Sequence, residues 1–223
     1  MKRWLVAWGL IAFAVVVLLG SPAAFWARLV DWPNGWRPQS VSGTLWDGRA
    51  QQIGPLGPVS WQLGLAGPVA DVQIGALQRR WLVTLRGWPW QWQASLRDDG
   101  STATSEQQVQ LEGEWGGQVD IRGRGQECTS SSGSLTAARL DLLAPWAMPL
   151  GKGELRIDCS GSPRLHARLE QAGQHRFVLV ANLSARTTEL EGTATNASEF
   201  AGLLRQFGLL GPGQEAFQAR FGW

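Results

Sequence analysis

The chain has 223 residues and a formal net charge of +2, and only 17% of its residues are charged. This near-neutral balance gives no support for binding to nucleic acid or to an acidic partner. Fourteen Trp and no Tyr are present, and because these tryptophans are dispersed, they indicate packing in a core and at interfaces more than a sugar-stacking platform.

An apolar segment lies at the start of the chain. Lys2 and Arg3 precede a run that contains no ionisable residue from Trp4 to Trp26. At about 1.5 Å per helical residue, this run is long enough to cross a ~30 Å hydrocarbon core, and the basic residues before it predict a cytoplasmic N-terminus. A cleaved signal peptide is the alternative, although its apolar region is usually shorter, at ~7–15 residues. We expect a transmembrane helix, with residues 1–27 as the cytoplasmic N-terminus and anchor and residues 28–223 as an exported domain.

The densest motif follows this segment, at residues 41–50, with the sequence VSGTLWDGRA. Its glycines permit positive φ or a close backbone approach, and Asp47-Gly48 is a favourable turn dipeptide, which predicts a hairpin that starts a sheet. The functional alternative makes Trp46 a docking residue, because Trp is enriched among interface hot spots. The residues of this candidate docking site are Gly43, Thr44, Leu45, Trp46, Asp47 and Gly48.

Beyond the motif the dominant hydrophobic period is two, as in strands with one buried face. Glycine-rich breaks separate the alternating runs, and such short connections predict an antiparallel meander. A one-sided sheet of this length must curl, pair with a second sheet or leave an apolar groove. Leu135 to Trp146 has mixed spacing that fits either a strand or a helix. The alternating runs lie at residues 59–65, 90–96, 109–115, 155–159, 165–169, 177–183 and 217–223.

One later segment has helical spacing. Asn196 followed by Glu199 resembles a capping box, and glycines from Gly208 onward end the pattern. We expect a short amphipathic helix that covers part of the apolar face of the sheet. Its apolar positions recur at i, i+3, i+4 and i+7, at Phe200, Leu203, Leu204 and Phe207.

Two cysteines, Cys128 and Cys159, are present in the chain. In an oxidising compartment such a pair suggests one disulfide, which would stabilise the fold by roughly 3 kcal/mol in the chain-entropy model. Cys159 is in phase with the apolar positions of its strand, so its sulfur should point to the buried side. Metal binding is the alternative, but it lacks further thiols or a spaced histidine pair, and we expect no metal site and no cofactor.

Groups suited to catalysis are scarce. We expect the two histidines, His166 and His175, to be surface residues. Zinc-peptidase and hydrolase-elbow motifs are absent from the sequence. A carbohydrate enzyme would need two paired carboxylates beside tryptophan faces, whereas most aspartates adjoin turns or alternate outward on strands. We therefore expect a protein that is not an enzyme. The aspartates considered are Asp47, Asp98, Asp99, Asp120, Asp141 and Asp158.

The SGTLWDGRA segment, placed shortly after an apolar N-terminal run, resembles the hallmark of the type II (general) secretion pathway protein N family. Trp61-Gln62-Leu63, the strand around Gly151-Lys152-Gly153 and the end Leu203–Gly208 also resemble that family. The resemblance implies a single-pass protein of the inner membrane in Gram-negative bacteria, with a periplasmic β-rich domain. It also implies a non-enzymatic accessory role in the machinery that exports folded proteins from the periplasm to the exterior.

The partners implied by this resemblance are the inner-membrane platform, the bitopic linker protein or the secretin. Pairing of a partner with the edge strand Phe217–Trp223 is one route to such contacts. The alternative function is a lipid-binding or lipid-transfer module, since a meander with a continuous apolar face resembles proteins of the AsmA-like type. Whether that face is closed by side chains or open distinguishes the two functions.

Overall fold

The computed structural model describes residues 2–33, 35–54, 56–64, 67–102, 110–144, 146–196 and 198–222. The helices are α1 (Lys2–Gly20), α2 (Ala23–Leu29) and α3 (Glu199–Gln206). The strands are β1 (Pro38–Gln39), β2 (Ser42–Gly43), β3 (Asp47–Ala50), β4 (Gln52–Ile53), β5 (Val59–Leu63), β6 (Val69–Ala76), β7 (Arg79–Trp88), β8 (Gln91–Thr102), β9 (Gln110–Arg124), β10 (Glu127–Ala144), β11 (Met148–Asp158), β12 (Arg164–Gln171), β13 (His175–Asn182), β14 (Thr187–Ala194) and β15 (Ala216–Gly222).

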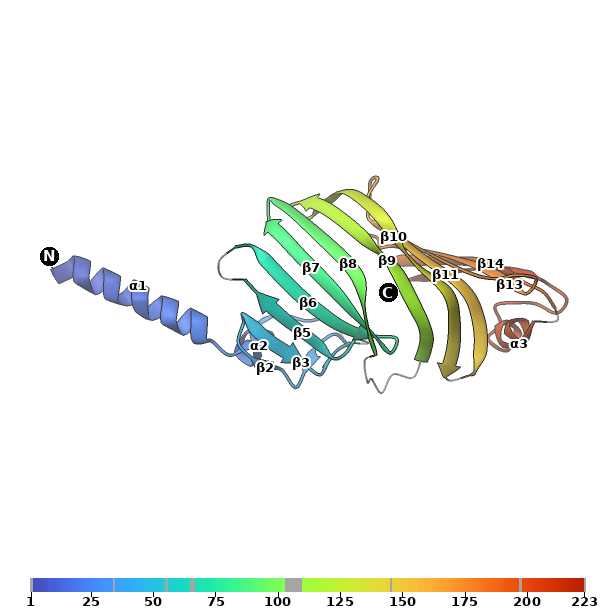
Figure 1. Cartoon of the computed structure of the whole chain (residues 1–223), viewed down its shortest axis with the longest axis horizontal. Helices are drawn as coiled ribbons and strands as arrows, with labels where there is room; N and C mark the ends of the chain where they lie inside the picture. The colour runs from blue at the N-terminus through green and yellow to red at the C-terminus, as the bar shows by residue number, and fades with distance from the viewer. Residues whose placement is uncertain are drawn as a thin grey trace.

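Within these residues, one curved antiparallel sheet of thirteen strands runs across the molecule (Figure 1). Its order from one edge to the other is the reverse of the chain order, from β15 back to β2, except that β4 leaves the sheet to pair with β1. The prediction of a mainly β fold with an antiparallel meander is therefore confirmed. Leu65, Val109 and Trp223, which the predicted alternation included, lie outside the described residues.

The prediction of a membrane-spanning helix over the N-terminal apolar run is wrong. The run from Trp4 to Trp26 is divided into two helices, because α1 ends at Gly20 and Pro22 stands immediately before α2. Proline has no N–H for a helical hydrogen bond, and its ring clashes with the preceding turn. Among the helices that the structure describes, none is both long and apolar enough to cross a membrane. The single-pass anchor over residues 1–27, and the inner-membrane localisation that depended on it, are corrected by this finding.

The sheet separates apolar from polar side chains onto two faces. Residues directly opposite on neighbouring strands share a face, and one such row runs Trp61–Val72–Val83–Leu96–Val119 across β5 to β9. We call the face that carries this row the apolar face. The next row, on the other face, runs through Gln62, Asp71, Thr84, Ser95 and Asp120.

A bulge in β10 explains the mixed spacing between Leu135 and Trp146. The pairing of β10 with both neighbours shifts between Ala137 and Leu140, so the apolar phase changes within one strand. A bulge also bends its strand, and Figure 1 shows β9, β10 and β11 as the visibly curved part of the sheet. Leu140 is 2% exposed and packs with Ala137, Met148 and Leu150.

Helix α3 covers the C-terminal part of the apolar face, as its spacing predicted. Ala201 and Leu204 are buried against a cluster that includes Phe177, Phe217 and Ala194. The helix begins after Ser198, whose hydroxyl oxygen accepts a hydrogen bond from the Ala201 N–H at 3.1 Å. The predicted cap at Asn196 is thus two residues too early.

Candidate functional site

The motif hairpin lies at one edge of the sheet, where β2 pairs with β3 and β3 pairs with β5. Thr44 closes the turn, since its N–H donates to the Asp47 carbonyl at 2.7 Å and its hydroxyl accepts from the Asp47 N–H at 3.1 Å. The Leu45 N–H donates to the Ser21 carbonyl at 3.3 Å. The motif therefore connects the N-terminal helices to the sheet edge.

The turn of this hairpin lies at Thr44–Trp46, and not at the predicted Asp47-Gly48, which belongs to β3. Gly48 lies directly opposite Trp61, and a Cβ on Gly48 would overlap the indole ring. Gly43 has φ +87° and approaches Asp47 so closely that its Cβ would be 2.5 Å from the Asp47 carbonyl oxygen. These glycines are required for close packing of the edge.

Trp46, the predicted docking residue, is half-buried, and its carbonyl accepts from the Leu63 N–H at 2.6 Å. The Trp61 indole N–H donates to the Leu45 carbonyl at 3.0 Å. Asp47 is exposed, whereas Gly48 is buried. The motif thus presents part of Trp46 and the Asp47 side chain at the surface of a hairpin that is hydrogen-bonded to its neighbours.

The apolar face is partly open. Val119, Leu135 and Leu140 in the middle strands are at most 2% exposed. In β5 to β8 the side chains of this face are mostly half-buried, and Leu85 is 38% exposed. At the end of this region a cavity of about 450 Å³ is lined by Leu63, Ala70, Leu85 and Trp92 among others. This surface can accept apolar groups.

A disulfide joins Cys128 at the start of β10 to Cys159 just after β11, with Cα atoms 5.4 Å apart. Cys159 is 4% exposed, so its sulfur does lie on the buried side. The bond links two strands that are already paired, at the end of the sheet where β9 also turns into β10.

His175 differs from its predicted surface position, because its side chain is 5% exposed. Its ring stacks on Phe177 with centroids 4.9 Å apart and contacts Phe200 of α3. The ring atom Nε2 lies 3.2 Å from the Leu150 carbonyl, to which it donates, while Nδ1 is buried with no partner among the described residues. Burial lowers the pKa of His175 below its ordinary value of 6.5, and the Leu150 hydrogen bond opposes this only in part. His166 is half-buried on the polar face, opposite Arg156 and Val180.

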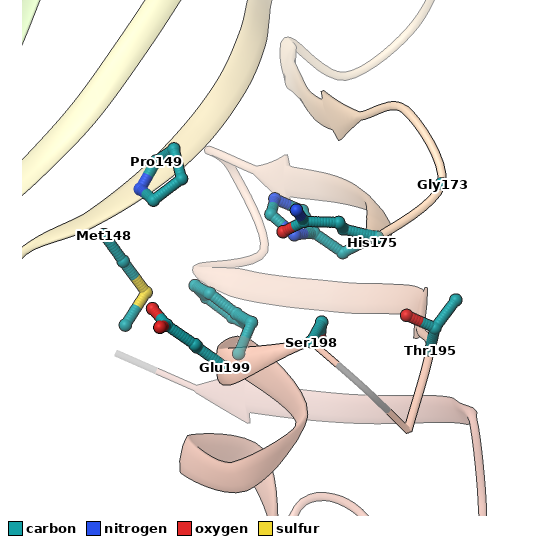
Figure 2. A pocket seen from close by; sticks show the side chains of 9 residues that line it. Met148, Pro149, Gly173, His175, Thr195, Ser198 and Glu199 are labelled. Carbon is teal, nitrogen blue, oxygen red and sulfur yellow. The ribbon is translucent and has the colours of Figure 1, made fainter.

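A cavity of about 380 Å³ lies beside the first turn of α3, and Figure 2 shows His175, Ser198 and Glu199 around it. These residue types occur in hydrolases, where a serine hydroxyl donates to a histidine. Here the Ser198 hydroxyl accepts the capping bond from the Ala201 N–H, and His175 donates to the Leu150 carbonyl. The described hydrogen bonds therefore do not link these side chains into a proton relay.

Within the part of the chain that the structure describes, no group of three or more His, Cys, Asp or Glu residues could hold a metal ion. Asp71 and Asp120 lie on the polar face, each hydrogen-bonded to a neighbour. Asp98 was expected at a turn but lies within β8, where its side chain is 3% exposed and forms an ion pair with Arg79.

The predicted position of Trp90, as an inward-facing residue of a strand over residues 90–96, is also wrong. Trp90 lies in the turn before β8 and is 64% exposed, stacked on Trp88, which is 55% exposed. The proline between these two tryptophans was the available signal, because proline favours turns over the interior of a strand.

The fold defines a mainly β protein, in which one long antiparallel sheet has its apolar face covered by α3 in one part and half-exposed in another. No protein-family model, no curated protein and no solved structure matches the chain.

Proposed function

We propose that this protein is a non-enzymatic accessory component of the type II secretion machinery, and that it acts by contacts with other proteins of that machinery. The observation that carries this proposal is the SGTLWDGRA segment, which resembles the secretion family and forms the hairpin joining the N-terminal helices to the sheet edge. The resemblance in sequence thus falls on a segment with a defined place in the fold.

The contact is made at the other edge of the sheet, through β15. This strand pairs with β14 over its whole length, from Ala216 to Gly222, and no described strand pairs with its outer side. The Ala194 N–H donates to the Glu215 carbonyl, so the backbone groups of Glu215 point toward β14. Because these groups alternate in direction along an antiparallel strand, those of Gln218 and Arg220 point away from the sheet. An extended segment of a partner can pair with these groups.

The test uses the full chain with purified inner-membrane platform, bitopic linker protein and secretin. Gln218→Pro removes one outward N–H without removing a hydrogen bond within the sheet, and Gln218→Ala is the matched control. We expect one of the three components to bind the wild type and the Ala variant, and binding to Gln218→Pro to be weakened about tenfold or more. If none of the three binds the full chain, the proposed function is wrong.

The second candidate function is a lipid-binding or lipid-transfer module, and the half-exposed apolar face of β5 to β8 favours it. The cavity lined by Leu63, Leu85 and Trp92 has the apolar walls that an acyl chain requires. Lipid extraction and mass spectrometry of the purified full chain tests this function. Stoichiometric lipid supports it, and a lipid-free protein that still binds a secretion component rejects it.

A further inference from the structure

Two stacked tryptophans project from the turn between β7 and β8. The rings of Trp88 and Trp90 are parallel within 2°, with centroids 5.2 Å apart, and the side chains are 55% and 64% exposed. Trp rings bury large apolar areas, and leaving two of them at one exposed tip costs free energy in water. A surface aromatic pair of this kind is well suited to the interface of a bilayer, where an indole has an apolar and a polar neighbourhood at once.

This turn is held by its neighbours. The Gly125 N–H donates to the Pro89 carbonyl at 2.8 Å, and the Trp92 indole N–H donates to the Gly125 carbonyl at 2.9 Å. The β7–β8 turn is thereby bonded to the β9–β10 turn. A tip fixed in this way loses little conformational entropy when it binds.

An apolar cavity lies beside this tip. Leu85 and Val69 are 38% and 39% exposed, and both line the cavity of about 450 Å³ that also includes Pro89 and Trp92. Pro89 therefore places this cavity next to the turn, whereas Trp88 itself is in phase with Arg86 on the polar side of β7.

Basic side chains lie on the polar face, beside the aromatic tip. Arg86 is aligned with Gln93 and Arg122 across three neighbouring strands, and all three are exposed. Arg124 follows at the end of β9, where Glu127 is its cross-strand neighbour. Among the described residues, no ion pair involves Arg86, Arg122 or Arg124. An apolar tip flanked by arginines complements a surface with an apolar interior and anionic headgroups.

We propose that the β7–β8 turn docks on the surface of an anionic lipid bilayer, with Trp88 and Trp90 inserted at the interface and Arg86, Arg122 and Arg124 beside the headgroups. This docking surface goes beyond both candidate functions, since it depends on neither a secretion partner nor a lipid held along the apolar face. The tip contacts the interface, and the arginines make this contact depend on lipid charge.

Photocrosslinking in the full chain tests this docking at residue level. Trp90 is replaced by p-benzoylphenylalanine, and a matched chain carries the same group at Trp146, which is 42% exposed in the segment between β10 and β11. Each is irradiated with vesicles of phosphatidylcholine, alone or mixed with phosphatidylglycerol. Because the N-terminal helices are identical in both chains, binding through them brings the same amount of each chain to the vesicles.

We expect lipid adducts at position 90 to exceed those at position 146 about fivefold or more in the mixed vesicles. Arg122→Gln should lower the yield at position 90 about fivefold, the effect of one basic residue near an anionic surface. Equal yields of lipid adducts at the two positions would overturn the proposal. So would a yield at position 90 that is the same with and without phosphatidylglycerol. Adducts to a secretion component in place of lipid, when both are present, would also overturn it and would assign the tip to a protein partner.

Discussion

Aromatic rings in this sheet lie over glycines on the neighbouring strand. Trp61 is opposite Gly48, Trp92 is opposite Gly123 and Phe177 is opposite Gly192. In each pair a Cβ on the glycine would overlap the ring. Such pairing covers the exposed backbone of a strand glycine, which gives these three glycines and their aromatic partners a shared structural role.

These pairs predict which glycines resist substitution. Gly123→Ala would force the Trp92 ring to move, and the new Cβ would also lie 2.6 Å from the Glu127 carbonyl oxygen. We expect the free energy of unfolding to fall by about 1–3 kcal/mol, measured by urea denaturation. Gly116→Ala in the same strand is the control, since its nearest atom outside the adjoining residues is 4.0 Å away. An equal effect of the two substitutions would contradict this packing.

His175 makes stability depend on pH. Its pKa is lowered in the folded protein by burial, so between this lowered value and 6.5 the unfolded chain binds more protons. The contribution of neutral His175 to the free energy of unfolding is fully present above pH 6.5. It is lost as the pH falls toward the pKa that His175 has in the folded protein, at up to about 1.4 kcal/mol per pH unit. In His175→Phe, which keeps an aromatic ring beside Phe177 and Phe200, denaturation across this range should show a shallower pH slope. A pH slope that survives in His175→Phe would assign the pH dependence to other groups.

Among the elements, the disulfide is the clearest contribution from two distant sequence positions. Cys128 and Cys159 are separated by 31 residues, and closing a loop of this length restricts the unfolded chain. Replacing both cysteines by serine should lower the free energy of unfolding by about 2–4 kcal/mol. A reducing agent should lower the free energy of unfolding of the wild type by a similar amount. The same reducing agent should leave the stability of the double variant unchanged. Stability that does not respond to reductant would show that the bond contributes little.

The sequence predicted the elements where one hydrophobic period persists along them. The alternation of Leu155 and Ile157, and the helical spacing of Phe200, Leu203 and Leu204, correspond to β11 and α3. It failed where a local irregularity changed the period. The bulge between Ala137 and Leu140 concealed β10, and Pro22 divided an apolar run that hydropathy alone treats as continuous.

The candidate site was less predictable than the elements. The motif hairpin was expected at residues 41–50 with its turn at Asp47-Gly48, but its turn depends on the Thr44 side chain and on the ring of Trp61, which lies on another strand. The burial of His175 depends on Phe200 and on β13 packing together. Such positions are set by tertiary contacts, which a linear pattern does not contain.

At the scale of the whole molecule, burial differs along the apolar face. The middle strands hide their side chains, with Val119 and Leu135 at 0% exposure, and α3 covers the cluster around Phe177 and Phe217. In β5 to β8, side chains such as Val83 and Leu96 are half-buried. The sheet therefore combines a closed part, which holds the fold together, with an open part whose apolar side chains are only half-buried.

Matched substitutions on the two parts test this division. Val83→Gln, on the open part, should lower the free energy of unfolding by about 1 kcal/mol, because the valine is only partly removed from water. Leu135→Gln, on the closed part, should cost about 3–5 kcal/mol, since it leaves a buried polar group and a cavity. Titration with a fluorescent fatty acid should show affinity about fivefold weaker for Val83→Gln than for the wild type, as expected for the loss of about 1 kcal/mol of apolar contact. If Val83→Gln destabilises as strongly as Leu135→Gln, the face is closed throughout, and acyl chains have no access to it.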